Sequence, residues 1–242
     1  MYFNRIKKKK HMKKITKTVV VGMTALALTI GVKVPASTIT VSAEEVSAKE
    51  VFSDNDVKRM KAVMNSSTIY NDYKLNHDDA PGSVSKLTKG TASRRMDVYP
   101  YRKGVILVTM DAYKDLIPTG HAAIIYDTFN VVESLAVGVT TGGNDWYRTK
   151  TTCYGVAMLH TNMAQDRKAA NYCYNQIGKP YNYNYYNMTT RKKFYCSQLI
   201  YAAYLDKFGI DLNTAWFDVG SLHAIHPGEL VLSPETYKIY QK

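Results

Sequence analysis

The sequence predicts an α+β fold in which short strands come first and two helices follow. Three apolar runs of strand length, 105–109, 120–126 and 131–135, are rich in β-branched residues and are separated by loop-forming residues. Further along, 164–177 and the stretch from 194 to Gly209 carry apolar residues at helical spacing. These two kinds of periodicity place strands and helices in one domain.

The first 43 residues form a leader and not part of this fold. They contain nine Lys or Arg residues and no acidic residue, and they end in Val-Ser-Ala at 41–43, a small-residue cleavage pattern. The apolar run from Thr18 to Val32 is only 15 residues long, which is short for a membrane span. We predict a signal peptide cut after Ala43, no stable membrane span after its removal, and a secreted protein able to associate with the cell wall. An uncleaved anchor is the alternative.

Charge and cysteine content exclude several classes of function. The formal charge is +12, but removing the nine leader cations from the 32 basic residues leaves 23 against 20 acidic ones, so no nucleic-acid partner is expected. The cysteines are Cys153, Cys173 and Cys196, an odd number; a disulfide between the first two stays open. No metal-ligand spacing or phosphate-binding glycine loop is present, so we predict no metal and no cofactor.

Residues 44–103 form a polar N-terminal segment. Asp54 is a candidate cap for a helix at about 54–65, with Val57, Met60, Val63 and Met64 on one face. The remainder is rich in Asn, Asp, Ser and Lys, which indicates a linker or a strap, and a mask over the active site also stays open.

The compact domain is predicted over 104–242. After the three strands, a polar loop at 140–148 carries Trp146 and could border a cleft, and strand character returns at 151–160. The 164–177 helix is stopped by Gly178 and Pro180. The segment 216–239 supplies connecting structure and an edge strand.

Seven tyrosines lie between 172 and 195, most densely at 181–186. Such amphipathic rings suit the wall of a binding cleft, although ordinary half-buried packing explains them equally well. We therefore take Tyr181, Tyr183 and Tyr195, together with Trp146, as candidate substrate-binding residues.

Cys196 is the candidate nucleophile because it begins an apolar helix that ends at Gly209. A thiol in the first turn lies at the positive end of the helix dipole, which lowers its pKa and raises the thiolate fraction. The alternative is a small buried apolar residue, as most cysteines are. The backbone N–H of Cys196 or Ser197 could supply part of an oxyanion site.

A cysteine nucleophile needs a base and a polar group that orients the base. His121 begins an apolar strand and is the candidate base, in preference to His160, His223 and His226; Glu133 is the candidate orienting acid. These two share a face only if the hairpin loop has an odd number of residues. Direct opposition requires a pivot at residue 127, whereas a four-residue loop at 127–130 places them on opposite faces.

The ordered segments Gly120-His121-Ala-Ala-Ile-Ile, Val-Val-Glu133-Ser134, Gly178-Lys-Pro-Tyr181 and Phe-Tyr-Cys196-Ser-Gln-Leu-Ile resemble the YiiX/YaeF-like branch of the NlpC-type cysteine hydrolases. The resemblance covers roughly 104–237. It implies a circularly permuted papain-like fold, in which a small antiparallel sheet carrying His121 and Glu133 packs against a helix that bears the nucleophilic Cys196.

The resemblance also implies a cysteine peptidase or amidase that acts on peptidoglycan peptides, and we expect a monomer. Related domains often carry an aspartate after Gly-x-Pro-Tyr, where this chain has asparagines at 182 and 184. Two alternatives stay open: a lipid or thioester acyl hydrolase or transferase on the same three residues, and a non-catalytic secreted binding module.

Overall fold

The structure is a computed structural model that describes residues 48–69, 98–112 and 120–242. All of these residues belong to one compact unit. The predictions for the leader, and for most of the linker or strap between 70 and 97, lie outside the described residues.

The centre of the unit is a six-stranded sheet in the order β4-β3-β2-β1-β5-β6, with every neighbouring pair antiparallel. The strands are β1 (Ile106–Thr109), β2 (His121–Ile125), β3 (Asn130–Leu135), β4 (Gly138–Gly143), β5 (Tyr154–Met158) and β6 (Thr236–Gln241). The first three agree with the predicted strands. They are short and β-branched, and β1 and β2 are buried along their whole length.

The helices are α1 (Ala48–Val51), α2 (Asp54–Ser66), α4 (Trp146–Thr149), α5 (Met163–Tyr174), α6 (Cys196–Phe208) and α7 (Glu229–Leu232). The helix predicted at about 54–65 is α2, but its cap is Ser53 and not Asp54, because the Ser53 hydroxyl accepts a hydrogen bond from the N–H of Asp56. Val63, expected on the apolar face, is 45% exposed. The helix α6 begins at Cys196 and ends at Gly209, which adopts the left-handed conformation with φ of 67°. None of the helices in the described part of the chain is long and apolar enough to cross a bilayer.

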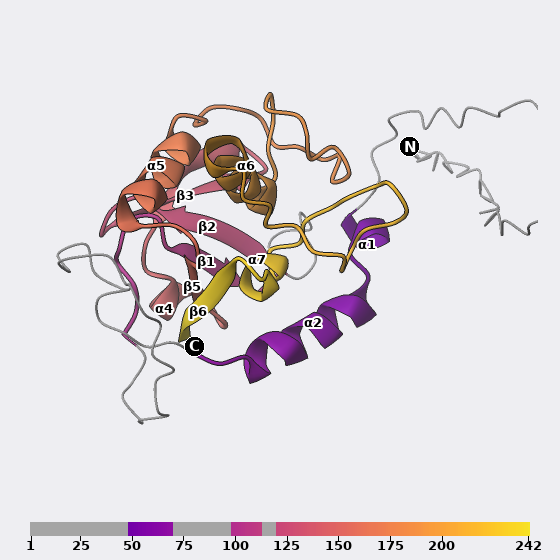
Figure 1. Ribbon diagram of the computed structural model, residues 1–242, viewed down its shortest axis with the longest axis horizontal. Helices are drawn as coiled ribbons and strands as arrows, with labels where there is room; N and C mark the ends of the chain where they lie inside the picture. The colour runs from indigo at the N-terminus through magenta and orange to yellow at the C-terminus, as the bar shows by residue number, and fades with distance from the viewer. Residues whose placement is uncertain (1–47, 70–97, 113–119) are drawn as a thin grey trace, which may run out of the picture. The chain divides into compact units, whose positions relative to one another are not determined.

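The two faces of the sheet are covered differently. Helices α5 and α6 lie side by side over one face (Figure 1), where they contact β2 and β3 and share a core cluster with Ile106, Val108 and Ile124. The other face carries a smaller aromatic cluster that includes Trp146 and Tyr240. An antiparallel sheet with a helix headed by Cys196 packed on it confirms the predicted α+β fold.

The prediction of a loop at 140–148 was wrong. Residues 138–143 form the edge strand β4, and 146–149 form the short helix α4. Three of the six residues in Gly-Val-Thr-Thr-Gly-Gly are glycines, which disfavour strands, but the backbone of this segment pairs along the whole of β3. Trp146 is correspondingly buried, with 3% of its surface exposed.

All three cysteines are free thiols. Cys153 lies in the cluster on one face of the sheet, and Cys173 lies among the helices on the other. The sheet therefore separates the two residues for which a disulfide had stayed open.

Candidate active site

The hairpin formed by β2 and β3 brings His121 and Glu133 onto the same face of the sheet. Ala123 pairs with Glu133 and Ile125 pairs with Val131, so the hairpin pivots at residue 128. The loop therefore contains an odd number of residues, as two side chains on one face of the sheet require. His121 nevertheless lies diagonally across from Glu133 and not directly opposite it. The expected pivot at residue 127 was wrong by one residue.

His121 Nε2 lies 2.6 Å from Glu133 Oε2, and both side chains are buried. The carboxylate has room because residue 142 on the neighbouring strand is glycine. A β-carbon at Gly142 would overlap Glu133 Oε1. Gly142 is a site residue that the sequence analysis did not identify. The available signal was the Gly-Gly pair at 142–143, which ends the segment that pairs with the strand of Glu133.

Cys196 lies beside the same imidazole ring. Burial lowers the pKa of His121, but hydrogen bonds and charge interactions with Cys196 and Glu133 outweigh burial and raise this pKa to about 9. Because Nε2 faces Glu133, Nδ1 is the ring nitrogen left for the thiol. The positively charged imidazolium is therefore favoured between two acidic groups.

Three hydrogen bonds fix the start of α6, where Cys196 is the first residue. The Ser134 hydroxyl on β3 donates to the carbonyl of Phe194 at 2.7 Å, and the Ser197 hydroxyl donates to the carbonyl of Ile225 at 2.7 Å. The N–H of Tyr195 donates to the side chain of Gln198 at 3.2 Å. With the Ser197 hydroxyl engaged, its contribution to an oxyanion site is limited to the backbone N–H in the first turn.

The two asparagines of the tyrosine-rich segment have structural partners. Asn182 is fully buried and donates to the side chain of Gln198 at 2.9 Å, and the N–H of Asn184 donates to Asn182 Oδ1 at 3.1 Å. The segment is therefore anchored to α6 at the position where related domains often carry an acid.

The predicted substrate-binding residues have different surroundings. Tyr183 is 41% exposed. Tyr181 is nearly buried, and its pKa is raised well above 10 by burial and by the neighbouring Cys196. Tyr195 is fully buried, and its hydroxyl donates to the carbonyl of Tyr185, so in this structure it presents no surface to a ligand. Trp146 stacks on His121 with ring centroids 5.6 Å apart.

The competing histidines do not share these surroundings. His160 and His223 are largely exposed, with the closest carboxylates being those of Glu235 at 3.9 Å and Asp218 at 2.8 Å. His226 is buried, and its Nδ1 accepts a hydrogen bond from the N–H of Gly228. Among the described residues, no three His, Cys, Asp or Glu side chains are grouped as metal ligands would be.

Part of the chain is similar to a described protein family. Residues 107–223 match the model of a family described as permuted papain-like amidase enzyme, YaeF/YiiX, C92 family. This is the family that the sequence segments resemble, so that prediction is confirmed. Among solved structures, a match is the crystal structure of metalloprotein YiiX from Escherichia coli O157:H7, with 14% identity and a TM-score of 0.48 over 59% of this chain and 98% of that chain. No curated protein matches.

Proposed function

We propose that this chain is a secreted cysteine hydrolase, an amidase that cleaves amide bonds in peptidoglycan peptides. Its residues 107–223 match the C92 family of permuted papain-like amidases. The observation that carries the proposal is the juxtaposition of Cys196, His121 and Glu133. The thiol lies at the start of a helix, the imidazole lies beside it, and the carboxylate holds the far side of the ring.

The proposed reaction is acyl transfer to water. His121 Nδ1 takes the proton of the Cys196 thiol, and the thiolate attacks the amide carbonyl carbon to form a tetrahedral intermediate. The intermediate collapses to a thioester as the imidazolium gives its proton to the departing amine. Water, deprotonated by the neutral imidazole, then hydrolyses the thioester, and the thiol recovers a proton.

Two features of the site stabilise the charges that develop. The carboxylate of Glu133 accepts a hydrogen bond from His121 Nε2–H, which fixes the tautomer and favours the imidazolium. The backbone N–H groups of Cys196 and Ser197 lie in the first turn of α6, where no intrahelical acceptor exists, and they suit the oxyanion.

The substrate class rests on two supports. The family description names an amidase, which favours amide over ester bonds. The leader, with its basic start, short apolar run and Val-Ser-Ala ending, supports export to the compartment where peptidoglycan lies.

The test is product analysis by mass spectrometry after incubation with purified peptidoglycan, free stem peptide and phospholipid. We expect new amine and carboxyl ends in the peptides, absent with Cys196→Ala and His121→Ala. Full activity in either variant contradicts the proposed residues. Release of fatty acid from the phospholipid without peptide cleavage contradicts the proposed substrate and selects the lipid alternative.

A further inference from the structure

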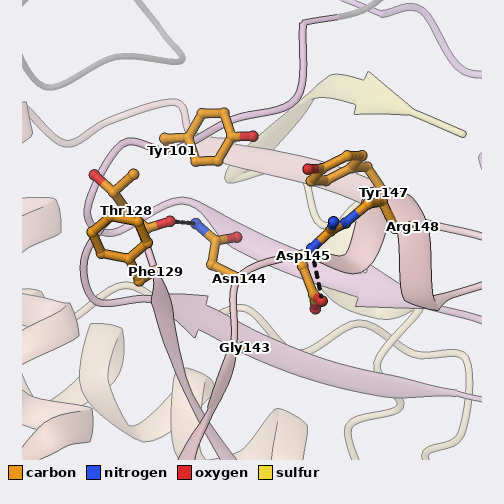
Figure 2. Close-up of a pocket in the computed structure, with 8 residues that line it drawn as sticks. All are labelled: Tyr101, Thr128, Phe129, Gly143, Asn144, Asp145, Tyr147 and Arg148. Carbon is orange, nitrogen blue, oxygen red and sulfur yellow. Dashed lines mark hydrogen bonds and ion pairs between the residues drawn. The ribbon is translucent and has the colours of Figure 1, made fainter.

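A pocket lies at the tip of the hairpin formed by β2 and β3. Its volume is about 450 Å³, and its lining comes from the hairpin loop between β2 and β3, from the segment joining β4 to α4, and from one residue before β1 (Figure 2). The lining residues are Tyr101, Thr128, Phe129, Gly143, Asn144, Asp145, Tyr147 and Arg148. Trp146, which stacks on His121, stands between two of them in the sequence.

The aromatic walls of this pocket are held in place. Tyr99 packs against Tyr101 and Tyr147, with ring centroids 5.3 and 4.9 Å away. Phe129, at the tip of the hairpin, is 79% exposed and makes the third wall. An exposed ring of this size at a loop tip adds nothing to the core, whereas it offers a flat face to a ligand.

The polar floor is also held in place. Asn144 accepts a hydrogen bond from the Tyr99 hydroxyl at 2.8 Å and donates to the carbonyls of Asp127 and Thr128 at 3.3 Å. Asp145 and Arg148 form a loose pair at 3.6 Å, so the rim offers both an acceptor and donors with little net charge. Figure 2 shows Asn144 and Asp145 between Phe129 on one side and Tyr147 on the other.

We propose that this pocket binds a sugar ring of the peptidoglycan glycan strand; this rests on the proposed function. A sugar presents apolar C–H faces to aromatic rings and hydroxyl and amide groups to mixed donors and acceptors. An amphipathic and nearly neutral pocket with two anchored aromatic walls matches that chemistry, because those two side chains need not be immobilised on binding.

The probe is chitotriose, three linked N-acetylglucosamine units, titrated into the full protein by calorimetry. We expect saturable binding that Phe129→Ala weakens about fivefold or more. Val137→Ala is the matched control, since Val137 is 84% exposed at the neighbouring hairpin turn and should leave the affinity unchanged. No binding by the wild type, or equal affinity in wild type and Phe129→Ala, overturns the proposal.

Kinetics separate this proposal from the proposed function. Phe129→Ala should lower kcat/KM for a sugar-bearing muropeptide and leave kcat/KM for the free stem peptide unchanged. Equal effects on both substrates overturn the sugar site. If the wild type cleaves neither substrate, the proposed function fails, and chitotriose binding alone decides whether the pocket is a sugar site.

A second, independent observation concerns access to the nucleophile. Cys196, His121 and Glu133 are only 2%, 3% and 9% exposed. Phe52, which follows α1 and is fully buried, packs edge-on against Tyr185 and His226 with ring centroids 5.3 and 5.1 Å away.

Each of these two neighbours borders the site. Tyr185 packs against Tyr195, the residue before Cys196, with ring centroids 5.2 Å apart. A β-carbon on Gly120, the residue before His121, would lie 3.0 Å from the ring of His226. Phe52 therefore contacts one residue packed near Cys196 and one packed near His121, although it precedes the region that matches the family.

The helix that follows is firmly anchored. The buried ammonium group of Lys238 donates to the carbonyl of Met64 at 2.6 Å, and the Tyr154 hydroxyl donates to Asn65 at 2.6 Å. We infer that residues 48–52 are a closing arm, attached through α2, that must shift for substrate to reach Cys196.

Alkylation by iodoacetamide, followed by peptide mass spectrometry, tests the arm. Phe52→Ala should raise the labelling rate of Cys196 about tenfold or more while the buried Cys153 and Cys173 stay slow. Val57→Ala, which truncates a buried side chain of α2, should leave all three rates unchanged. An unchanged rate at Cys196 in Phe52→Ala, or the same rise in Val57→Ala, overturns the arm. If Phe52→Ala fails to fold, Phe52→Leu replaces it under the same two criteria.

Discussion

At the scale of single residues, the proposed chemistry depends on two protons that Cys196, His121 and Glu133 share. Glu133 lies on the Nε2 side of His121 and Cys196 lies beside the same ring, and Trp146 stacks on it. Burial of this set removes water that would compete for its hydrogen bonds. Each member is therefore sensitive to changes that preserve its shape but alter its charge.

Replacing Glu133 with Gln should lower kcat by roughly 10²–10⁴-fold with little change in KM, because the amide no longer favours the imidazolium or fixes its tautomer. Steady-state kinetics on a stem peptide measures the effect. Glu235→Gln is the matched control, since that acid approaches only the exposed His160 at 3.9 Å. A kcat within twofold of the wild type would show that Glu133 does not orient the base.

The raised pKa of His121 predicts a pH dependence of stability. The folded pKa of about 9 exceeds the ordinary 6.5, so the charged ring stabilises the folded state fully below pH 6.5 and progressively less as the pH rises to about 9. The difference in unfolding free energy between wild type and His121→Gln should therefore shrink from pH 6 to pH 9.5. Urea unfolding at several pH values measures it, and a difference that grows with pH would contradict the assignment.

At the scale of elements, the sheet and its helices are joined by buried polar contacts as well as apolar packing. Arg102, four residues before β1, forms an ion pair with Asp166 in the first turn of α5 at 2.6 Å, and both side chains are buried. Tyr204 on α6 donates a hydrogen bond to the carbonyl of Gly104 nearby. These contacts fix α5 and α6 over the strands that carry the site.

Arg102→Met should destabilise the fold by about 3–5 kcal/mol, because it leaves the carboxylate of Asp166 buried without its cation. Burial already raises the pKa of Asp166, and Arg102 opposes that rise. Denaturant unfolding at neutral pH measures the loss. Arg59→Met is the control, since Arg59 pairs with Asp56 at the surface and should change stability by less than about 0.5 kcal/mol. A loss in Arg102→Met no larger than in the control would contradict the structural role.

At the scale of the whole molecule, the free energy of unfolding should fall as the pH rises from 4.5 to about 8. Glu229, the first residue of α7, is fully buried. Burial raises its pKa to about 8, against an ordinary 4.5, although hydrogen bonds from Thr214 and the N–H of His226 oppose the rise. The folded protein therefore holds a proton that the unfolded chain releases, and stability falls as the pH rises from 4.5 to 8.

Glu229→Gln should remove much of that decline, because the amide does not ionise. Thermal unfolding at pH 5, 6.5 and 8 measures the slope in both proteins. An identical slope in wild type and variant would place the titration on another group.

Much of the architecture could be predicted from local sequence. Strands β1 to β3 and helix α6 with its terminal Gly209 follow from periodicity, whereas the shared face of His121 and Glu133 depended on a loop length that the sequence left open. Strand β4 could not, because its pairing is set by β3 and not by its own residues. The glycine at 142 is explained only by the carboxylate that lies over it.

The burial of the site was also beyond sequence reasoning. Nothing local in Phe52 indicates that its ring would pack beside Tyr185 and His226, which lie far along the chain. Likewise, a dense run of tyrosines does not separate Tyr195, which is buried at the start of α6, from the exposed Tyr183. Long-range contacts decide which rings face solvent.

In the proposed mechanism, the Cys196 sulfur becomes acylated during turnover. Intact-protein and peptide mass spectrometry on acid-quenched mixtures with a stem peptide measures it directly. We expect a mass increase on Cys196 equal to the mass of the acyl part of the substrate. This increase should be absent from Cys196→Ala and should form more slowly in His121→Ala. Steady substrate cleavage by Cys196→Ala, or an adduct on Cys153 or Cys173 alone, would contradict it.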